Sequence, residues 1–161
     1  MGIKTPKNTV NGIDSNVCNP TADWSVICNS SNALIAELSK DNPSASTVLD
    51  LTNLMSKTKG YLRLGYQGGL DYFNTHLSNH PWNKPLFVAC HKISEVSAIL
   101  GMTATSAKFS SFRALTRVSS KHLHNVLNLA RKKDNCPMPS VAAILEVIDS
   151  NPRFLKKKKP I

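Results

Sequence analysis

A run of basic residues that no acidic residue interrupts extends from Lys108 to Lys133. On an α-helix, with about 100° between successive residues, Arg113, Arg117 and Lys121 fall on one narrow stripe that faces away from Phe112. A helix that is buried on one side and cationic on the other can contact phosphates or enter a major groove. Basic residues also occupy ordinary solvated faces, but such faces usually mix both signs of charge. The pattern therefore favours binding to a polyanion.

The distribution of charge along the chain points the same way. Among the 161 residues, positions 1–80 carry equal numbers of basic and acidic groups, so positions 81–161 hold the whole net charge of +10. That half stays positive without the lysines at 156–159, although an ordinary protein with a basic tail is the plainer alternative. An asymmetry of this kind between halves is typical of nucleic-acid-binding proteins.

Hydrophobic spacing predicts a mostly α-helical protein, and a hydrophobic fraction of 41% is enough for one core. We divide the chain into four parts, of which the first is a loosely ordered arm rich in Asn, Thr, Ser and Pro. The parts are the N-terminal arm 1–30, a helical support region 31–80, a basic helical nucleic-acid-binding region 81–150 and a lysine-rich tail 151–161. Helices are expected at about 30–40, 44–58, 91–100, 105–121, 120–133 and 140–148. Residues 60–77 are compatible with short strands or a broken helix, and 86–90 with a strand or a helix start.

The clearest local signal is a break between two helices. Gly101 follows the apolar periodicity of residues 91–100, and glycine suits a helix C-terminus because it adopts positive φ without steric penalty. Thr103, Thr105 and Ser106 can each cap the N-terminus of the next helix. That helix is expected to bury an apolar row that begins at Phe109 and continues through Phe112, Leu115 and Val118.

Residues 93–118 resemble the helix-turn-helix of DNA-binding regulators. Ser97 supplies the small residue four places before the turn glycine, and Leu100 and Met102 supply the flanking apolar residues. The resemblance implies that the helix from about Thr105 is the recognition helix, whose early residues face base edges: Thr105, Ser106, Lys108 and Ser111. The sequence departs from the pattern at Ala107 and Ser110, where the second helix normally buries larger aliphatic residues.

A second resemblance competes with the first. Lys84 to Val88, followed by two helices and by Lys121 to Val126, is similar in spacing to the core of FinO/ProQ RNA chaperones. This resemblance implies that the partner is a structured RNA. The Gly-x-x-Arg and Asp-x-x-Gly elements of that family are absent after the second helix.

No residue pattern predicts a specific reaction, and we expect neither an enzyme nor a cofactor. Cys90 and His91 are adjacent and so point in different directions, which makes Cys90 a core residue in our interpretation. His76 and His80 are four residues apart, but no Cys or carboxylate lies in register to complete a metal site. The glycines at 65–69 lack the Lys-Ser/Thr of a P-loop.

The cysteines and the hydropathy pattern indicate a compartment. None of the four cysteines forms a Cys-x-x-Cys pair, and there is no apolar signal peptide or membrane span. We therefore expect free thiols, a cytoplasmic location and no membrane partner.

Together these patterns predict a sequence-specific DNA-binding transcriptional regulator, a repressor of viral or mobile-element origin. We expect a homodimer on double-stranded DNA, because one small DNA-binding domain seldom gives enough specificity. A FinO/ProQ-like RNA-binding regulator and a structural or protein-interaction module are the alternatives. The predicted nucleic-acid-binding residues are Thr103, Thr105, Ser106, Lys108, Arg113, Arg117, Lys121, Arg131, Lys132 and Lys133.

Overall fold

A computed structural model describes residues 20–157, and most of these residues are helical, as predicted. The α-helices are α1 (Pro20–Leu38), α2 (Ala45–Lys57), α3 (Gly60–Arg63), α4 (Gly69–His76), α5 (Lys84–Leu100), α6 (Phe109–Leu115), α7 (Leu123–Asp134) and α8 (Val141–Ser150). Four short 3₁₀ helices also occur, and they are η1 (Pro81–Asn83), η2 (Ser106–Lys108), η3 (Ser120–His122) and η4 (Pro152–Phe154). None of the described helices is long and apolar enough to cross a bilayer.

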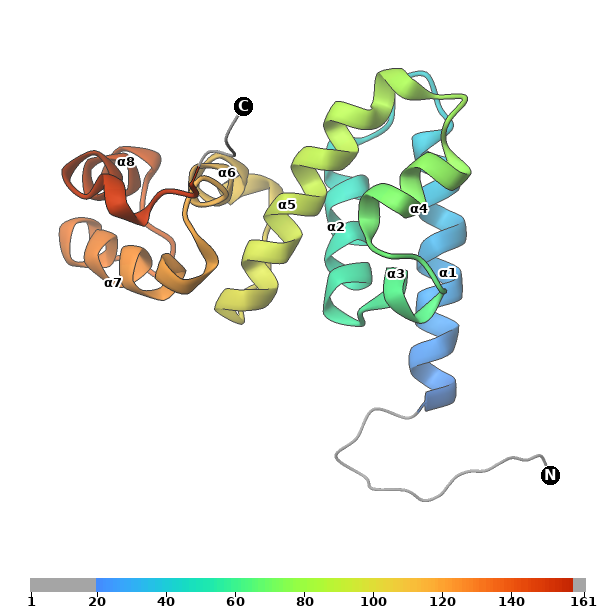
Figure 1. The fold of residues 1–161 in the computed structure, drawn as a ribbon, viewed down its shortest axis with the longest axis horizontal. Coiled ribbons are helices and arrows are strands. Elements are labelled where there is room, and N and C mark those ends of the chain that lie inside the picture. The colour runs from blue at the N-terminus through green and yellow to red at the C-terminus, as the bar shows by residue number, and fades with distance from the viewer. Residues whose placement is uncertain (1–19, 158–161) are drawn as a thin grey trace.

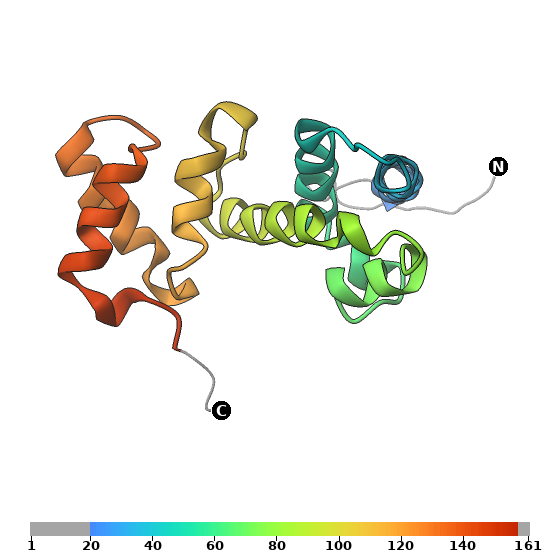
Figure 2. The same ribbon diagram turned by 90° about the horizontal axis from the view of Figure 1, so that it is seen from above.

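Helix α5 connects two groups of helices (Figure 1). Helices α1 to α4 lie on one side of it, and α6, α7 and α8 lie on the other. Figure 2 shows α5 running across the view while α6 runs steeply across its end, so the two helices cross. A continuous apolar core joins the groups, from Leu34 in α1 through Phe87 and Ile93 in α5 to Phe112 and Ile148.

The predicted start of the first helix was wrong. We expected an arm over residues 1–30, but α1 already begins at Pro20, and the boundary between 30 and 31 falls inside it. Proline is tolerated in the first turn of a helix, where its missing N–H has no partner to lose. Ile27 and Leu34 are fully buried, so packing stabilises a helix despite the polar composition. Residues 1–19 of the expected arm lie outside the described residues.

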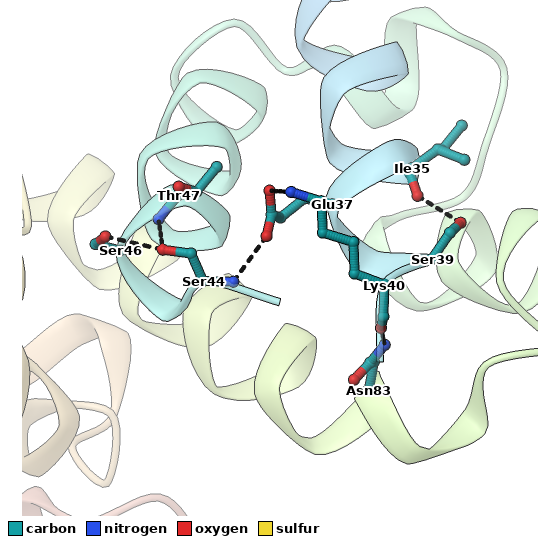
Figure 3. A network of polar contacts seen from close by, with 8 residues as sticks. All are labelled: Ile35, Glu37, Ser39, Lys40, Ser44, Ser46, Thr47 and Asn83. Carbon is teal, nitrogen blue, oxygen red and sulfur yellow. Dashed lines mark hydrogen bonds and ion pairs between the residues drawn. The ribbon is translucent and has the colours of Figure 1, made fainter. Parts of the chain in front are cut away.

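Polar contacts fix the corner between α1 and α2 (Figure 3). The Glu37 carboxylate accepts hydrogen bonds from the backbone N–H of Ser44 at 2.7 Å and from Lys40 Nζ at 3.0 Å. Ser44, where the second helix was expected to start, is the N-cap of α2, and its hydroxyl accepts from Thr47 N. The amide of Asn83 donates to the carbonyl oxygens of Leu38 and Lys40, which fastens η1 and the start of α5 to the same corner.

Small polar residues line the contact between α2 and α5. The hydroxyl of Ser94 donates to Thr52 Oγ1 at 2.8 Å or to the carbonyl oxygen of Cys90, also at 2.8 Å. Ser97 lies one turn further along α5 and bonds to Asn53 Oδ1 at 3.4 Å. All of these groups are buried or half-buried with partners, so the seam gives α5 a fixed position against the support helices.

Two ambiguous segments turn out to be helical. Residues 60–77 contain the short helices α3 and α4 rather than strands, separated by a turn in which Gly65 has a φ of +99°. Residues 86–90 belong to α5, which begins at Lys84 with a proline in its first turn. The expectation of a helix over 91–100 was therefore too short by seven residues at its start.

The predicted helix after Gly101 is also shorter than expected. It begins as η2 and ends at Leu115, and Val118 pairs instead with Leu155 in an isolated antiparallel bridge. The predicted interior is correct, because Phe112, Leu115 and Val118 are buried and Phe109 is half-buried. Helices α7 and α8 occupy the last two predicted segments.

Candidate nucleic-acid interface

The turn between α5 and α6 is held by its own backbone and by α2. Gly101 ends α5 with a φ of +67°, the left-handed conformation that glycine adopts without strain. The side-chain amide of Asn53 in α2 donates to the carbonyl oxygen of Ala104 at 2.9 Å. Thr105 has an extended backbone and precedes η2. Thr103, Thr105, Ser106 and Lys108 are all exposed on the surface, as base contacts require. The expectation for Ser111 was wrong, because its side chain is buried and its hydroxyl donates to the carbonyl oxygen of Pro139 at 2.7 Å.

Basic residues surround a hollow between α5 and α6. Its volume is about 600 Å³, and Lys84 and Lys92 from α5 meet Arg113 from α6 around it. The remaining lining residues are Pro81, Pro85, Val88, Ala89 and Thr116. None of the residues in this lining is acidic, so no carboxylate among them neutralises the three cations.

A second basic hollow lies where the chain ends. It measures about 550 Å³ and is lined by Lys121 from η3, Arg153 from η4, and Lys156 and Lys157. Ser119, Ser120 and Leu155 complete its lining, so the described residues supply no carboxylate here either.

The four-residue segment 116–119 joins the two hollows. Thr116 lines the first, Ser119 lines the second, and Arg117 is exposed between them. The backbone N–H of Lys156 donates to the carbonyl oxygen of Arg117 at 3.0 Å, and Ser119 N donates to Phe154 O at 2.8 Å. These bonds bring residues 154–156 beside the segment that follows α6. We define the basic surface as Lys84, Lys92, Arg113, Arg117, Lys121, Arg153, Lys156 and Lys157.

The structure thus brings together Arg113, Arg117 and Lys121 from the predicted set, but not as a stripe on one helix. Only Arg113 lies in α6, since that helix ends at Leu115, and Lys121 lies in η3. The helical-wheel argument was wrong in its geometry. Contacts with the end of the chain, rather than a helical period, place these cations near one another.

The predicted cluster at the end of α7 lies elsewhere. Arg131 donates to the carbonyl oxygen of Pro137 at 2.8 Å and contacts the sulfur of Met102, and Lys133 forms an ion pair with Glu146 at 3.1 Å. Lys132 is exposed beside them. The twelve-residue helix α7 separates this cluster from Lys121 by about 18 Å, at 1.5 Å per residue. Arg131 and Lys133 therefore stabilise the α7–α8 connection.

Lys108 also lies near this end of α7, close to Asp134. The backbone N–H of Ser140 hydrogen-bonds to the Asp134 carboxylate, and this bond is the main reason why the pKa of Asp134 lies below its ordinary value, with a small contribution from the charge of Lys108. The predicted base-facing lysine thus lies near an ionised carboxylate, apart from the basic surface.

The predicted set lacked five members of the basic surface: Lys84, Lys92, Arg153, Lys156 and Lys157. Lys84 and Lys92 precede the basic run from Lys108 to Lys133, and Arg153 follows it. A signal for two of them was present, because Lys84, Val88 and Lys92 recur every four residues and so lie along one face of a helix. Arg153 had no such signal, since η4 reaches the second hollow through long-range contacts.

The cysteine and histidine pairs do not assemble into a reactive site. Cys90 is fully buried, and burial raises the pKa of its thiol to about 11, as suits the core residue that we predicted. His76 bonds to the Tyr66 hydroxyl, and His80 packs against Trp82. Within residues 24–157, no three His, Cys, Asp or Glu side chains gather closely enough to hold a metal ion.

Comparison with models of protein families, with curated proteins and with solved structures finds no match to this chain.

Proposed function

We propose that this protein binds duplex DNA through the basic surface. The observation that carries the proposal is the gathering of cations from α5, α6, η3, η4 and the chain end around two hollows lined by no described acidic residue. Phosphate contacts supply most of the affinity of non-specific DNA binding and position a protein on the duplex. Lysine and arginine on an open, uncompensated surface suit this role.

Base reading is the second part of the proposal. The order of α5, a glycine turn and α6, with the two helices crossing, supports the resemblance to helix-turn-helix regulators. Thr103, Thr105, Ser106 and Lys108 would then contact base edges while the basic surface holds the backbone. We propose a transcriptional repressor that acts in the cytoplasm as a homodimer, because two DNA-binding domains double the length of DNA sequence that is recognised.

The first experiment measures binding to a fluorescent 24-base-pair duplex and to an RNA hairpin of equal charge, by anisotropy, between 50 and 300 mM salt. A protein that neutralises about five phosphates on DNA shows a slope near −4.5 in a plot of log affinity against log salt. Duplex binding that is at least tenfold tighter than hairpin binding supports the proposal. Preference for the hairpin would instead favour the RNA-binding alternative, and salt-independent retention would favour a protein-interaction module.

The second experiment selects bound sequences from a random duplex pool. Enrichment of a palindrome supports both base reading and a symmetric dimer. Salt-dependent retention without any enriched motif would remove the repressor part of the proposal and leave non-specific DNA binding.

A further inference from the structure

A third hollow, of about 380 Å³, lies among α2, α3, α4 and α5, away from the basic surface. It shares no residue with either basic hollow. Its apolar walls come from Met55, Leu62, Ala98 and Ile99. Leu62 and Ile99 are 58% and 42% exposed, so the hollow opens to the surface between them. Its size falls within the range of about 300–1,000 Å³ that is usual for small-molecule sites.

Unpartnered polar atoms gather at this hollow. Among the described residues, four buried side-chain polar atoms have no hydrogen-bond partner, and three of them belong to residues that line it: Ser56 Oγ, Tyr61 Oη and His91 Nδ1. Tyr61 is 95% buried, with an exposed fraction of only 5%. A buried polar atom without a partner costs about 1–3 kcal/mol, so three at one place indicate groups that a bound molecule would satisfy.

The hydrogen-bonding character of these groups follows from their surroundings. Burial lowers the pKa of His91, against the opposing charge of Glu95, so the ring is neutral at neutral pH. His91 Nε2 lies 3.6 Å from Glu95 Oε1, which favours the tautomer with the proton on Nε2 and leaves Nδ1 as an acceptor. Burial raises the pKa of Tyr61 beyond any physiological range, so its hydroxyl is a neutral donor.

Aromatic rings and a glycine pack closely around His91. His91 stacks on Phe87 with the ring planes 5° apart, and Tyr61 meets His91 edge to face at 5.5 Å between centroids. Gly69 packs on His91 so closely that a Cβ atom there would lie 2.8 Å from the ring. The charged residues of the hollow, Lys59 and Glu95, are exposed and of opposite sign.

From these observations we propose that the hollow binds an uncharged heterocycle of nucleobase size that presents a hydrogen-bond donor beside an acceptor. The donor of the ligand meets His91 Nδ1, its acceptor meets the Tyr61 hydroxyl, and Ser56 serves either role. Met55, Leu62 and Ile99 cover the apolar faces. A lone water is a poor occupant, because the hollow is about ten times the roughly 30 Å³ that one water occupies in the liquid.

The test uses free nucleobases as probes on the full chain. Uracil and adenine are titrated into ¹⁵N-labelled protein, and shifts of the backbone amides of Gly69, Ala98 and Ile99 report binding. 1,3-Dimethyluracil, which has the same ring but no N–H donor, is the matched negative probe. We expect saturable shifts with uracil or adenine at micromolar to low millimolar concentration and at least a fivefold weaker response to the dimethyl compound.

Two variants connect the response to the unpartnered atoms. Tyr61→Phe removes one hydroxyl and is expected to weaken binding about fivefold, whereas Tyr66→Phe, outside the hollow, should leave it unchanged. Ala98→Leu narrows the hollow from an exposed position and should abolish the shifts while the rest of the spectrum keeps the pattern of the folded protein. Absence of a response to both bases, equal response to the dimethyl compound, or unchanged affinity in Tyr61→Phe would overturn the proposal, as would a crystal structure with uracil that holds only ordered waters there.

Discussion

Asn53 in α2 and Ala104, four residues beyond the end of α5, are joined by a 2.9 Å hydrogen bond from the side-chain amide to the backbone carbonyl. The bond links positions 51 residues apart in the chain. It ties the turn that displays Thr103 and Thr105 to the support helices, whereas α6 beyond it packs against α8. The orientation of the proposed reading segment therefore depends on α2, which has no other proposed role in contacting DNA.

Asn53→Ala should lower the free energy of unfolding by about 1 kcal/mol, because a half-buried carbonyl loses its partner. Urea denaturation followed by circular dichroism measures this change. Asn128→Ala, at an exposed position of α7, is the matched control and should change stability by less than about 0.5 kcal/mol. Equal stability of the two variants would show that water replaces the Asn53 amide at no cost.

Gly69→Ala should destabilise the protein by about 1–3 kcal/mol, because the added methyl group would lie 2.8 Å from the His91 ring. The ring cannot retreat freely, since Phe87 stacks on its other face. Gly68→Ala is the control, because a Cβ there meets nothing within 4 Å. Thermal unfolding of both variants provides the comparison, and a stable Gly69→Ala protein would mean that the α4–α5 contact is looser than described.

Stability should fall as the pH drops below the ordinary pKa of histidine, about 6.5. Burial holds the pKa of His91 below that value, so the unfolded chain binds a proton that the folded chain excludes. The contribution is complete above pH 6.5 and is lost as the pH falls toward the pKa of the folded state. The groups facing the ring are Glu95, which opposes the shift, Lys92, which adds to it, and the neutral Tyr61.

His91→Gln should therefore flatten the pH dependence of the unfolding free energy between pH 7 and pH 5. Asn125→Gln, which changes a non-titratable residue at an exposed position of α7, should leave the dependence unchanged. Titration of the imidazole signals by NMR provides the direct measurement. A pKa of His91 at or above 6.5 would contradict the prediction.

Arg113→Ala and Lys92→Ala should each weaken duplex binding uniformly across sequences. Each should also make the slope of log affinity against log salt shallower by about one, because each removes one phosphate contact. Lys132→Ala removes the same charge at the far end of α7 and should leave the slope within error of the original. A larger effect from Lys132 than from Arg113 would place DNA on the other end of the α6–α8 group.

Local signals predicted the parts of the fold that local interactions determine. Ser44 and Ser140 mark the starts of α2 and α8 because their hydroxyls accept from backbone N–H groups three residues on. Gly101 marks the end of α5 for the same kind of reason, since its left-handed backbone closes the helix. Each of these interactions lies within a few residues of chain, where a pattern is visible.

Long-range contacts explain what the sequence pattern did not reveal. Nothing near Val118 requires the helix to end at Leu115, and the bridge partner that Val118 takes, Leu155, lies 37 positions away. Lys84 and Arg113 meet because α5 crosses α6, a relationship that no periodicity encodes. The hollow with Tyr61 and His91 is hidden for the same reason, as its residues come from four helices.

The last described residues hold the segment between α6 and α7 in place. Because Leu155 and Lys156 bond across to Val118 and Arg117, removal of these two residues should loosen the chain between α6 and α7. A purification tag fused after Lys157 would lie close to Arg117 and the basic surface. Protein for measuring DNA affinity is better tagged at the other end.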